Sequence, residues 1–460
     1  MQSLRIYNTK TRTVEEFKSI TPGVALVYSC GPTVYHYAHL GNLRAFIFAD
    51  ILRRTLEAHN YSVKHVINIT DVGHLTSDGD TGEDKLEKGA SREGKTVWEV
   101  AQYYENEFRK DLTLLQIPLT AYQFPRATDY IQEQIDLIRV LEEKGFTYDT
   151  SDGIYFDTAK FPHYGELAHL DIEGLRSGAR VEENTEKRNV TDFALWKFSP
   201  KNEKRQMEWD SPWGIGFPGW HIECSAMSQK LLGKHFDIHT GGIDHISVHH
   251  ENEIAQSESA TGEPFVNYWM HVNFLLDTTG KMSKSSGDFL RLQTLTDKGL
   301  NPLAYRYFTL TAHYRKELTF SYEALQASSV AYTKLVHFVL AHRKNGGEIL
   351  PTYLDACKEA LANDLNSPEA IAVIWKMMKD TTFEKSHICA TLLAIDSMLG
   401  LGLRELQEVH IPHEVEHLLV ERTTAREKKD WATSDRIRDE IQAKGFTVQD
   451  TDEGQILLQG

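Results

Sequence analysis

The sequence predicts an α/β protein in which a Rossmann-like, doubly wound parallel sheet carries an inserted domain and is followed by a helical bundle and a small α+β C-terminal domain. The main observation is a β-α-β pattern. A β-branched and aromatic run over residues 24–28 precedes a helical period over 41–60, and an apolar run over 63–69 completes the pattern. Strands joined in this way are parallel, and their ligand crevice lies beyond their carboxyl ends. The polar residues expected at that edge are Cys30, His39 and Thr70.

Turn and periodicity signals divide the rest of the chain. An expected helix over 130–144 and a hairpin at Asp152-Gly153 mark an insertion, and a helical pattern begins at Pro302. In the last unit a charged helix precedes two short strands. The expected division is 1–121 and 211–301 for the two halves of the nucleotide-binding fold, 122–210 for the inserted domain, 302–410 for the helical domain and 411–460 for the last unit, with strands at 446–449 and 455–458.

Composition and charge limit the classes of function. With 460 residues the chain is too long for one ordinary core, and 41% hydrophobic and 25% charged residues are typical of folded globular proteins. The balance of 50 Lys+Arg against 66 Asp+Glu leaves a net charge of −16, which argues against charge-driven adhesion to nucleic acid or membranes. Any contact with RNA must therefore use local basic patches.

The four cysteines are scattered too widely for a disulfide framework, and no apolar stretch reaches the length of a membrane helix. We therefore expect a cytoplasmic protein without membrane segments. Cys30 and Cys224 are expected to be ligands, whereas Cys357 and Cys389 are expected in the core.

The first chemical signature is PTVYHYAHLGN, residues 32–42, where a strand turns into a helix. A helix N-terminus offers free N–H groups and a positive dipole to a triphosphate. Gly41 allows close approach to the backbone, and His39 and Asn42 add donors. The alternative is a histidine that only caps the helix or bonds within a turn.

The second signature is KMSKS, residues 281–285, between Gly280 and Gly287. Lys281 and Lys284 on such a loop can close over a phosphate chain and neutralise the charge that develops as pyrophosphate leaves. The alternative is a solvated basic loop. Together the two signatures resemble the pair found in class I aminoacyl-tRNA synthetases, which implies activation of an amino acid by ATP with Mg²⁺.

Four further side chains are acceptable ligands for zinc. His249 and Glu253 are four residues apart and share one face of a helix, while Cys30 and Cys224 supply thiolates from distant strand ends. For an arbitrary set of this kind, the favoured interpretation is two buried cysteines and a histidine paired with a carboxylate.

Resemblance to a family reverses that preference. The segments GWHIECSAM, residues 219–227, and HHENEIAQ, residues 249–256, are similar to cysteinyl-tRNA synthetases. The similarity covers nearly the whole chain and implies a monomeric cysteine–tRNA ligase with one Zn²⁺ per chain and L-cysteine, ATP and tRNA(Cys) as substrates. The family's zinc ligands correspond to Cys30, Cys224, His249 and Glu253. The histidines left around the ligands or facing the substrate are His221, His239, His245 and His250.

Further residues are expected at the substrates. Thr70 and Trp220 are expected at the cysteine, and Gly41, Asp244 and Lys284 at ATP, where Asp244 accepts from the ribose unless it is only a turn residue. Zinc suits this substrate because an apolar pocket separates amino acids differing by one small group by only about 1–3 kcal/mol. A metal that binds a thiolate strongly and a hydroxyl poorly discriminates cysteine from serine better.

The C-terminal unit resembles the anticodon-binding end of the same family. Exposed aromatics stack on unpaired bases, arginines hold phosphates and carboxylates accept from base amino groups. The alternative is that Trp431 anchors its helix to the strands. The anticodon candidates are Arg426, Trp431, Asp435 and Asp450.

Departures from the family pattern and two rival functions stand beside this prediction. Asn42 replaces the family's usual histidine and cannot become cationic, and the stretch 72–83 has no assigned role. A ligase that couples cysteine to an amino sugar would share the ATP and zinc sites but should lack the last unit. A non-catalytic paralogue that only binds RNA or nucleotide should have lost the lysines or the metal ligands.

Overall fold

A parallel four-stranded sheet forms the centre of the computed structural model, which describes residues 3–72, 84–170, 186–200, 205–277, 280–281, 290–406, 412–451 and 454–459. The strand order is β10-β9-β3-β4, with every neighbouring pair parallel. The β3-α1-β4 unit and the β9-α7-β10 unit therefore meet between β3 and β9, as predicted for a doubly wound sheet. The bounds in this part are β3 Val24–Ser29, α1 Leu40–Ala58, β4 Ser62–Ile67, α6 Trp220–Leu232, β9 Phe236–Gly242, α7 Glu251–Thr261 and β10 Val266–Val272.

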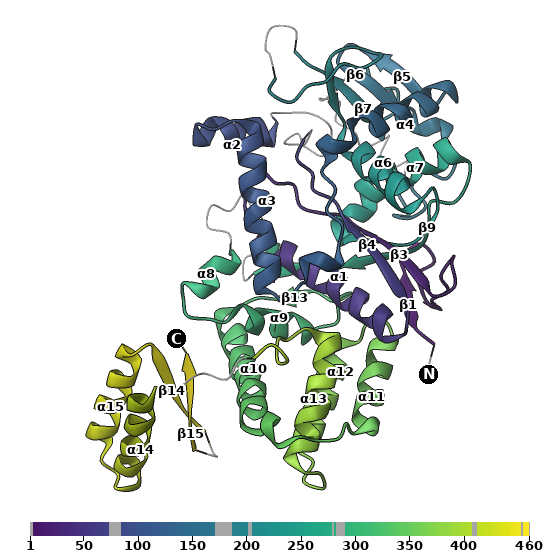
Figure 1. Cartoon of the computed structure of the whole chain (residues 1–460). Coiled ribbons are helices and arrows are strands. Elements are labelled where there is room, and N and C mark those ends of the chain that lie inside the picture. Colours follow the sequence, from purple (N-terminus) through teal and green to yellow (C-terminus); the bar gives the residue numbers. More distant parts are fainter. Residues whose placement is uncertain are drawn as a thin grey trace.

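Helix α1 connects the sheet to the rest of the molecule. It packs between the sheet on one side and the helical bundle on the other (Figure 1), and its buried face belongs to a core shared by both. Asn301 caps α9 and Pro302 occupies its first turn, so the bundle begins where the sequence predicts. The bundle comprises α9 Pro302–Leu310, α10 Tyr322–His342, α11 Pro351–Ala362, α12 Ser367–Met378 and α13 Lys385–Leu399, and the short helix α8 Leu292–Thr296 precedes it.

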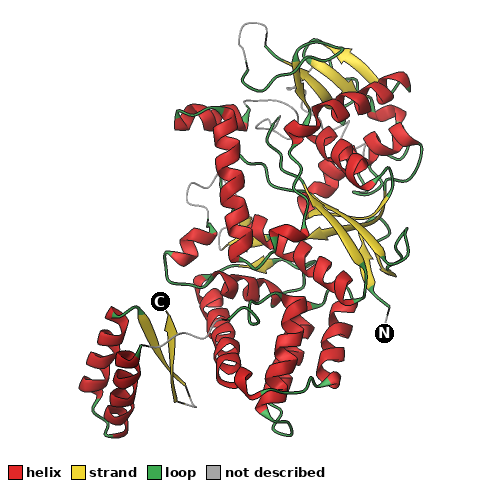
Figure 2. Ribbon diagram, viewed as in Figure 1, coloured by secondary structure: helices red, strands yellow, loops and turns green. Residues whose placement is uncertain are grey.

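The inserted segment builds an antiparallel sheet of its own (Figure 2), and the strand order is β5-β6-β7-β8. The expected helix is present as α4, which ends before Gly145, and the hairpin at Asp152-Gly153 joins β5 to β6. Strand β8 pairs with β7, so this sheet runs beyond the expected boundary at residue 210. The bounds are α4 Ile131–Glu143, β5 Thr147–Thr150, β6 Gly153–Phe156, β7 Phe193–Phe198 and β8 Gly216–Pro218.

Smaller elements border the central sheet. The hairpin of β1 and β2 precedes it, α2 and α3 follow β4, and β11 pairs with both β12 and β13. Thr96 and Glu99 form a capping box at the start of α3. The bounds are β1 Arg5–Asn8, β2 Thr13–Glu16, α2 Lys85–Glu93, α3 Val97–Leu114, β11 Leu275–Asp277, β12 Gly280–Lys281 and β13 Leu318–Thr319.

The chain ends in a small unit with a separate core. Two helices pack on an antiparallel hairpin, and its buried cluster consists of Val415, Ile437, Ile441, Phe446 and Val448. Both predicted strands are present. The bounds are α14 His413–Glu427, α15 Trp431–Ala443, β14 Phe446–Thr451 and β15 Gly454–Gln459. Among the described residues, no helix is both long and apolar enough to span a bilayer.

Candidate active site and metal centre

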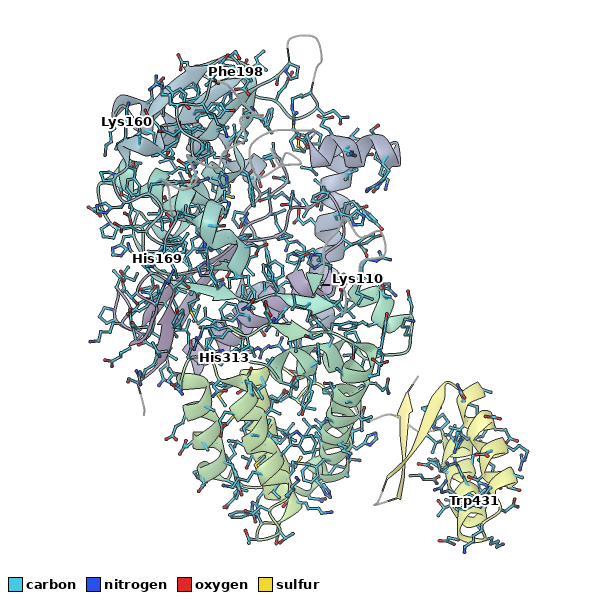
Figure 3. The ribbon with its side chains drawn as sticks, turned by 180° about the vertical axis from the view of Figure 1, so that it is seen from behind. Lys110, Lys160, His169, Phe198, His313 and Trp431 are labelled. Carbon is cyan, nitrogen blue, oxygen red and sulfur yellow. The ribbon has the colours of Figure 1, made fainter. Side chains whose placement is uncertain are left out.

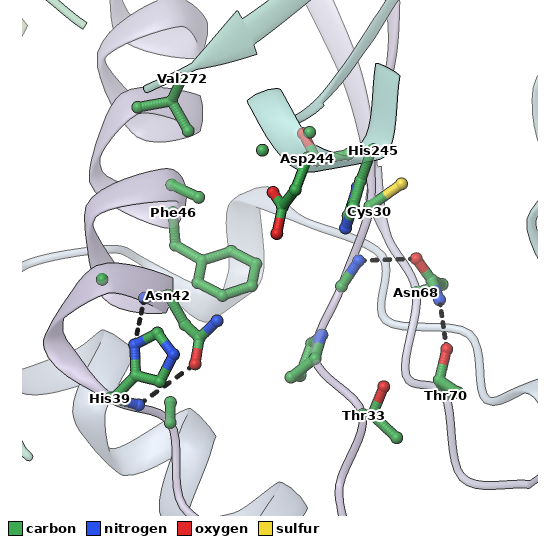
Figure 4. Close-up of a pocket in the computed structure, with 18 of the residues that line it drawn as sticks. Cys30, Thr33, His39, Asn42, Phe46, Asn68, Thr70, Asp244, His245 and Val272 are labelled. Carbon is green, nitrogen blue, oxygen red and sulfur yellow. Dashed lines mark hydrogen bonds between the residues drawn. The ribbon is translucent and has the colours of Figure 1, made fainter. Parts of the chain in front are cut away.

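A cavity of about 330 Å³ lies at the carboxyl ends of β3 and β9, where the two halves of the sheet meet. Such switch points are the usual ligand sites of doubly wound sheets. Segments that are far apart in the sequence form its walls. They are the turn after β3, the start of α1 and the residues after β9 (Figure 4), together with the start of α6. The cavity therefore collects most of the residues that the sequence singled out.

The first signature forms the start of α1. His39 is the N-cap residue, and its Nδ1 accepts a hydrogen bond of 3.0 Å from the backbone N–H of Asn42. In return the Oδ1 atom of Asn42 accepts from the backbone N–H of His39 at 3.2 Å (Figure 4). A Cβ on Gly41 would come within 3.0 Å of the His39 ring, so the missing side chain makes room for that ring. The capping alternative for His39 is thus real, yet both side chains also line the cavity.

The second signature lies partly within the described residues. Phe274 and Leu275 line the cavity, and β11, which starts at Leu275, pairs with the strand that ends at Lys281. The backbone of Lys281 therefore lies on the strand next to the one that borders the cavity. Lys284 lies outside the described residues.

The end of β9 supplies the opposite wall. Gly242 is the last residue of the strand, and Asp244 follows in a short 3₁₀ turn, with both lining the cavity. A Cβ on Gly242 would lie 2.4 Å from the Oδ1 atom of Asp244, so the carboxylate folds back over this glycine. Asp244 thus projects into the same cavity as His39 and Asn42.

Cys30, Cys224, His249 and Glu253 converge on one point beside the cavity. Their ligand atoms all lie within 4.8 Å of one another. The Nε2 atom of His249 is 2.9 Å from the Oε1 atom of Glu253, as expected for one helical face, although His249 lies in a π-helical turn before α7. The prediction that Cys224 follows a strand is wrong. Cys30 does follow β3, but Cys224 lies in the second turn of α6.

The electrostatics of this cluster favour a thiolate at Cys224 and a carboxylate at Glu253. A hydrogen bond from Cys30 lowers the pKa of Cys224 to about 6, whereas burial raises the pKa of Cys30 well above its usual value. Although burial opposes it, the charges of His239 and His249 lower the pKa of Glu253 to about 2. Burial alone would lower the pKa of His249, but the charge of Glu253 outweighs it and raises this pKa to about 10. The cluster thus holds anionic donors in a buried place, which suits a cation.

Other histidines support these donors. His221 contacts the Nδ1 atom of His249 at 2.9 Å, and His239 contacts the Oε2 atom of Glu253 at 2.8 Å. A second set of potential ligands combines Cys30 and Glu253 with His239 and His250. Of the histidines in the two sets, His249 lines the cavity, together with Cys30 and Cys224, whereas His239 and His250 lie behind it.

Thr70 and Trp220 lie where the sequence predicts the substrate. Both line the cavity, and the Trp220 ring packs on His249 with centroids 4.4 Å apart. Sequence reasoning missed Asn68, which donates to the Oγ1 atom of Thr70 at 3.1 Å and accepts from the backbone N–H of Gly31 at 2.7 Å (Figure 4). The signal available was its position at the end of the predicted strand 63–69.

Comparisons with known proteins agree with this geometry. Residues 16–330 match the family described as "tRNA synthetases class I (C) catalytic domain", and residues 409–456 match "Cysteinyl-tRNA ligase anticodon binding domain". The chain belongs to the cysteine–tRNA ligase family of class I synthetases. Among its relatives, Cysteine–tRNA ligase 1 of Burkholderia lata is 52% identical, with 99% of this chain and 97% of that protein covered. The Cysteine–tRNA ligase of Treponema denticola is 42% identical, with 97% and 98% covered.

Solved structures of other class I synthetases share the fold. The methionyl-tRNA synthetase of Mycobacterium tuberculosis bound by methionyl-adenylate has a TM-score of 0.57 at 15% identity, over 82% of this chain and 90% of that one. The LeuRS of the LeuRS-tRNA-LeuAMS complex from Agrobacterium radiobacter has a TM-score of 0.59 at 11% identity, over 84% of each chain. The predicted α/β fold class is therefore confirmed.

In the unit that matches the ligase family's anticodon domain, Trp431 starts α15 with 56% of its surface exposed (Figure 3). The described buried cluster of the unit does not include Trp431, and this observation favours a role at the surface over an anchor for the helix. The guanidinium of Arg426 lies 5.5 Å from the centroid of its ring. Asp435 pairs with Arg438 on α15 at 3.3 Å, and the backbone of Asp450 lies in β14.

Proposed function

We propose that the chain activates L-cysteine with ATP to cysteinyl-adenylate and pyrophosphate, and then transfers cysteine to the 3′ end of tRNA(Cys). One observation carries the proposal: a cluster with two cysteine sulfurs opens onto the same cavity as the N-terminus of α1. The first supplies recognition of a thiol, and the second supplies a place for phosphates. Family membership over nearly the whole chain supports the same activity.

The donor set fits zinc. Two sulfurs, one imidazole nitrogen and one carboxylate oxygen are ligands that Zn²⁺ accepts, and the set Cys30, Cys224, His249 and Glu253 is preferred because three of its members face the cavity. When bound, zinc would act as a Lewis acid that binds the thiolate of the substrate strongly and a hydroxyl group weakly. Trp220 and Thr70 would complete the cysteine pocket, with Asn68 orienting the hydroxyl of Thr70.

The capping box orients the donors for ATP. Because the Nδ1 atom of His39 accepts a hydrogen bond, its ring proton resides on Nε2, which can donate to a phosphate. The Oδ1 atom of Asn42 is likewise occupied, so its amide NH₂ is the group offered to the cavity. An amide donor carries no positive charge, so the role proposed for Asn42 needs no imidazolium.

The remaining roles complete the reaction. The cysteine carboxylate attacks the α-phosphorus of ATP, and the chain needs to position both groups and to stabilise the charge that develops. Lys281 and Lys284 would neutralise the leaving pyrophosphate together with Mg²⁺, Gly41 and the N-terminus of α1 would accommodate phosphates, and Asp244 would accept from the ribose. The ribose hydroxyl at the 3′ end of the transfer RNA then attacks the carbonyl of the adenylate, which forms the ester, breaks the bond to the phosphate and releases AMP.

The acceptor RNA would be recognised by the last unit. An exposed Trp431 beside the cation of Arg426 suits stacking on an unpaired base next to a phosphate. Asp435 and Asp450 are proposed to accept from base amino groups. In this division of the chain, 1–121 and 219–301 catalyse, 122–218 is the insertion, 302–410 connects and 411–460 binds the anticodon. The cytoplasmic location and the monomeric state stay predictions.

Pyrophosphate exchange tests the proposal. The purified chain is incubated with ATP, labelled pyrophosphate and each amino acid in turn, and cysteine should stimulate exchange far more than serine. Equal stimulation by serine, or none by any amino acid, would contradict it. Charging of unfractionated transfer RNA then separates this function from a cysteine–amino sugar ligase, against which the match to an anticodon-binding domain already counts.

A further inference from the structure

A chain of three hydrogen bonds leads from the metal cluster to the hairpin at the N-terminus. The Nε2 atom of His250 lies 3.2 Å from the sulfur of Cys30. The Nδ1 atom of His250 lies 2.8 Å from the Nε2 atom of His271, and the Nδ1 atom of His271 lies 2.7 Å from the hydroxyl of Thr9. Thr9 follows β1 and His271 belongs to β10, so neither was singled out by the sequence.

The groups at each contact determine the direction in which these hydrogen bonds are donated. At 2.8 Å the two facing imidazole nitrogens need one donor and one acceptor. The other nitrogen of His271 faces the hydroxyl of Thr9, which can either donate or accept, so the order of donors is set from the sulfur end. If the sulfur of Cys30 is a thiolate, His250 donates to it, His271 donates to His250, and the hydroxyl of Thr9 donates to His271. The opposite polarity would require a proton on the sulfur.

The residues around these three hydrogen bonds hold their partners in place. A Cβ on Gly241 would lie 2.8 Å from the Cε1 atom of His250, so this ring rests directly against the backbone of β9. The ring of Trp269 packs on His250 with centroids 4.8 Å apart, and the backbone N–H of Thr9 donates to the carbonyl of Trp269 at 2.8 Å. His250 and Thr9, near the two ends of this series of hydrogen bonds, are therefore both held against the central sheet.

We infer that Thr9 and His271 are positioning residues of the metal centre, because through His250 they keep an N–H directed at the sulfur of Cys30 and so stabilise it as a metal-bound thiolate. The inference rests on the proposed function, since it needs Cys30 to be a ligand. Partners of metal ligands commonly change metal affinity by about 10- to 100-fold. In this chain the effect reaches the metal over three hydrogen bonds, from a residue in the first hairpin.

The test compares Thr9→Val, which removes the hydroxyl at nearly constant shape, with Thr9→Ser, which keeps it. The full chain is loaded with Co²⁺ in place of zinc. The thiolate-to-Co²⁺ charge-transfer band is recorded, and the metal dissociation constant is measured by competition with a chelator. Thr9→Val should move the band to longer wavelength, because His250 is then held less firmly as a donor and a thiolate with a weaker hydrogen bond is ionised more easily. It should also weaken binding by about 10-fold. Thr9→Ser should match the wild type.

His271 offers a second pair of variants if Thr9→Val does not fold. His271→Gln keeps an N–H for His250 and should retain the band, whereas His271→Phe should shift it. Identical bands in Thr9→Val and Thr9→Ser would overturn the inference. A weaker affinity with an unmoved band would also overturn it, since His250 would then bind the metal itself. A wild-type chain with no thiolate band would instead contradict the proposed metal site.

Discussion

Asp50, at the middle of α1, provides a quantitative test of how the sheet is fastened to the helical bundle. Its carboxylate is completely buried and accepts from Arg53 at 2.9 Å, from Arg54 at 2.7 Å and from Arg306 of α9 at 2.6 Å. Burial alone would raise the pKa of Asp50, but the arginines, Arg306 first, hold it well below its usual range. We expect Asp50→Asn to leave buried positive charge without its counter-ion.

The magnitude follows from the burial of the partners. Removing one member of a buried ion pair typically costs about 3–5 kcal/mol. Arg306 is fully buried and keeps two acceptors, the carbonyls of Leu399 and Leu115, so its hydrogen bonds are partly satisfied without Asp50. We therefore expect a loss near the lower limit, about 3 kcal/mol.

The assay must be local, because a chain with several domains does not unfold in two states. Hydrogen exchange of the amides in α1 and α9 reports the free energy of opening for each helix. The matched control is Glu57→Gln, which removes another carboxylate partner of Arg53. The side chain of Glu57 is 47% exposed, so this variant should cost no more than about 0.5 kcal/mol. Equal losses in the two variants would refute the reasoning.

The interaction of Asp50 with its arginines also predicts a pH dependence of stability. A carboxyl whose pKa is lowered by folding contributes stability that is present above its unfolded pKa of about 4 and is lost as the pH falls further. The difference between wild type and Asp50→Asn should therefore shrink progressively below about pH 4, while it stays constant between pH 5 and 7. A difference that does not change down to pH 3 would mean that Asp50 is not the ionised partner.

Three further predictions concern the site. Cys224→Ser should lower bound zinc and cysteine-dependent pyrophosphate exchange together, and full exchange in a metal-free variant would contradict the metal site. Asn42→Ala should reduce the exchange rate by about 100-fold, the typical effect of losing one donor to developing charge, whereas Asn42→His should retain activity, as checked by steady-state kinetics. Trp431→Ala should lower kcat/KM for transfer RNA by roughly 5- to 150-fold, equivalent to about 1–3 kcal/mol of stacking, and should leave pyrophosphate exchange unchanged. A parallel loss of exchange would show that the variant acts on the fold.

Local patterns were sufficient for the elements and for several site residues. The run 24–28, the helical period 41–60 and the glycine at 145 correspond to β3, α1 and the end of α4. Each depends on side-chain alternation or on backbone freedom within a few residues, which the sequence displays directly. The spacing of His249 and Glu253 likewise brought both to one face.

Only the tertiary structure decided which of these segments meet. The order β10-β9-β3-β4 places the end of β3 beside the end of β9, and this is what brings Cys30 to Cys224 and His249. Strand pairing between distant segments leaves no period in the sequence, so the helix that carries Cys224 and the strand that extends the inserted sheet to Pro218 were not foreseen. The sequence alone determined which chemistry the chain can hold, whereas the packing of distant strands determined the place where its groups act together.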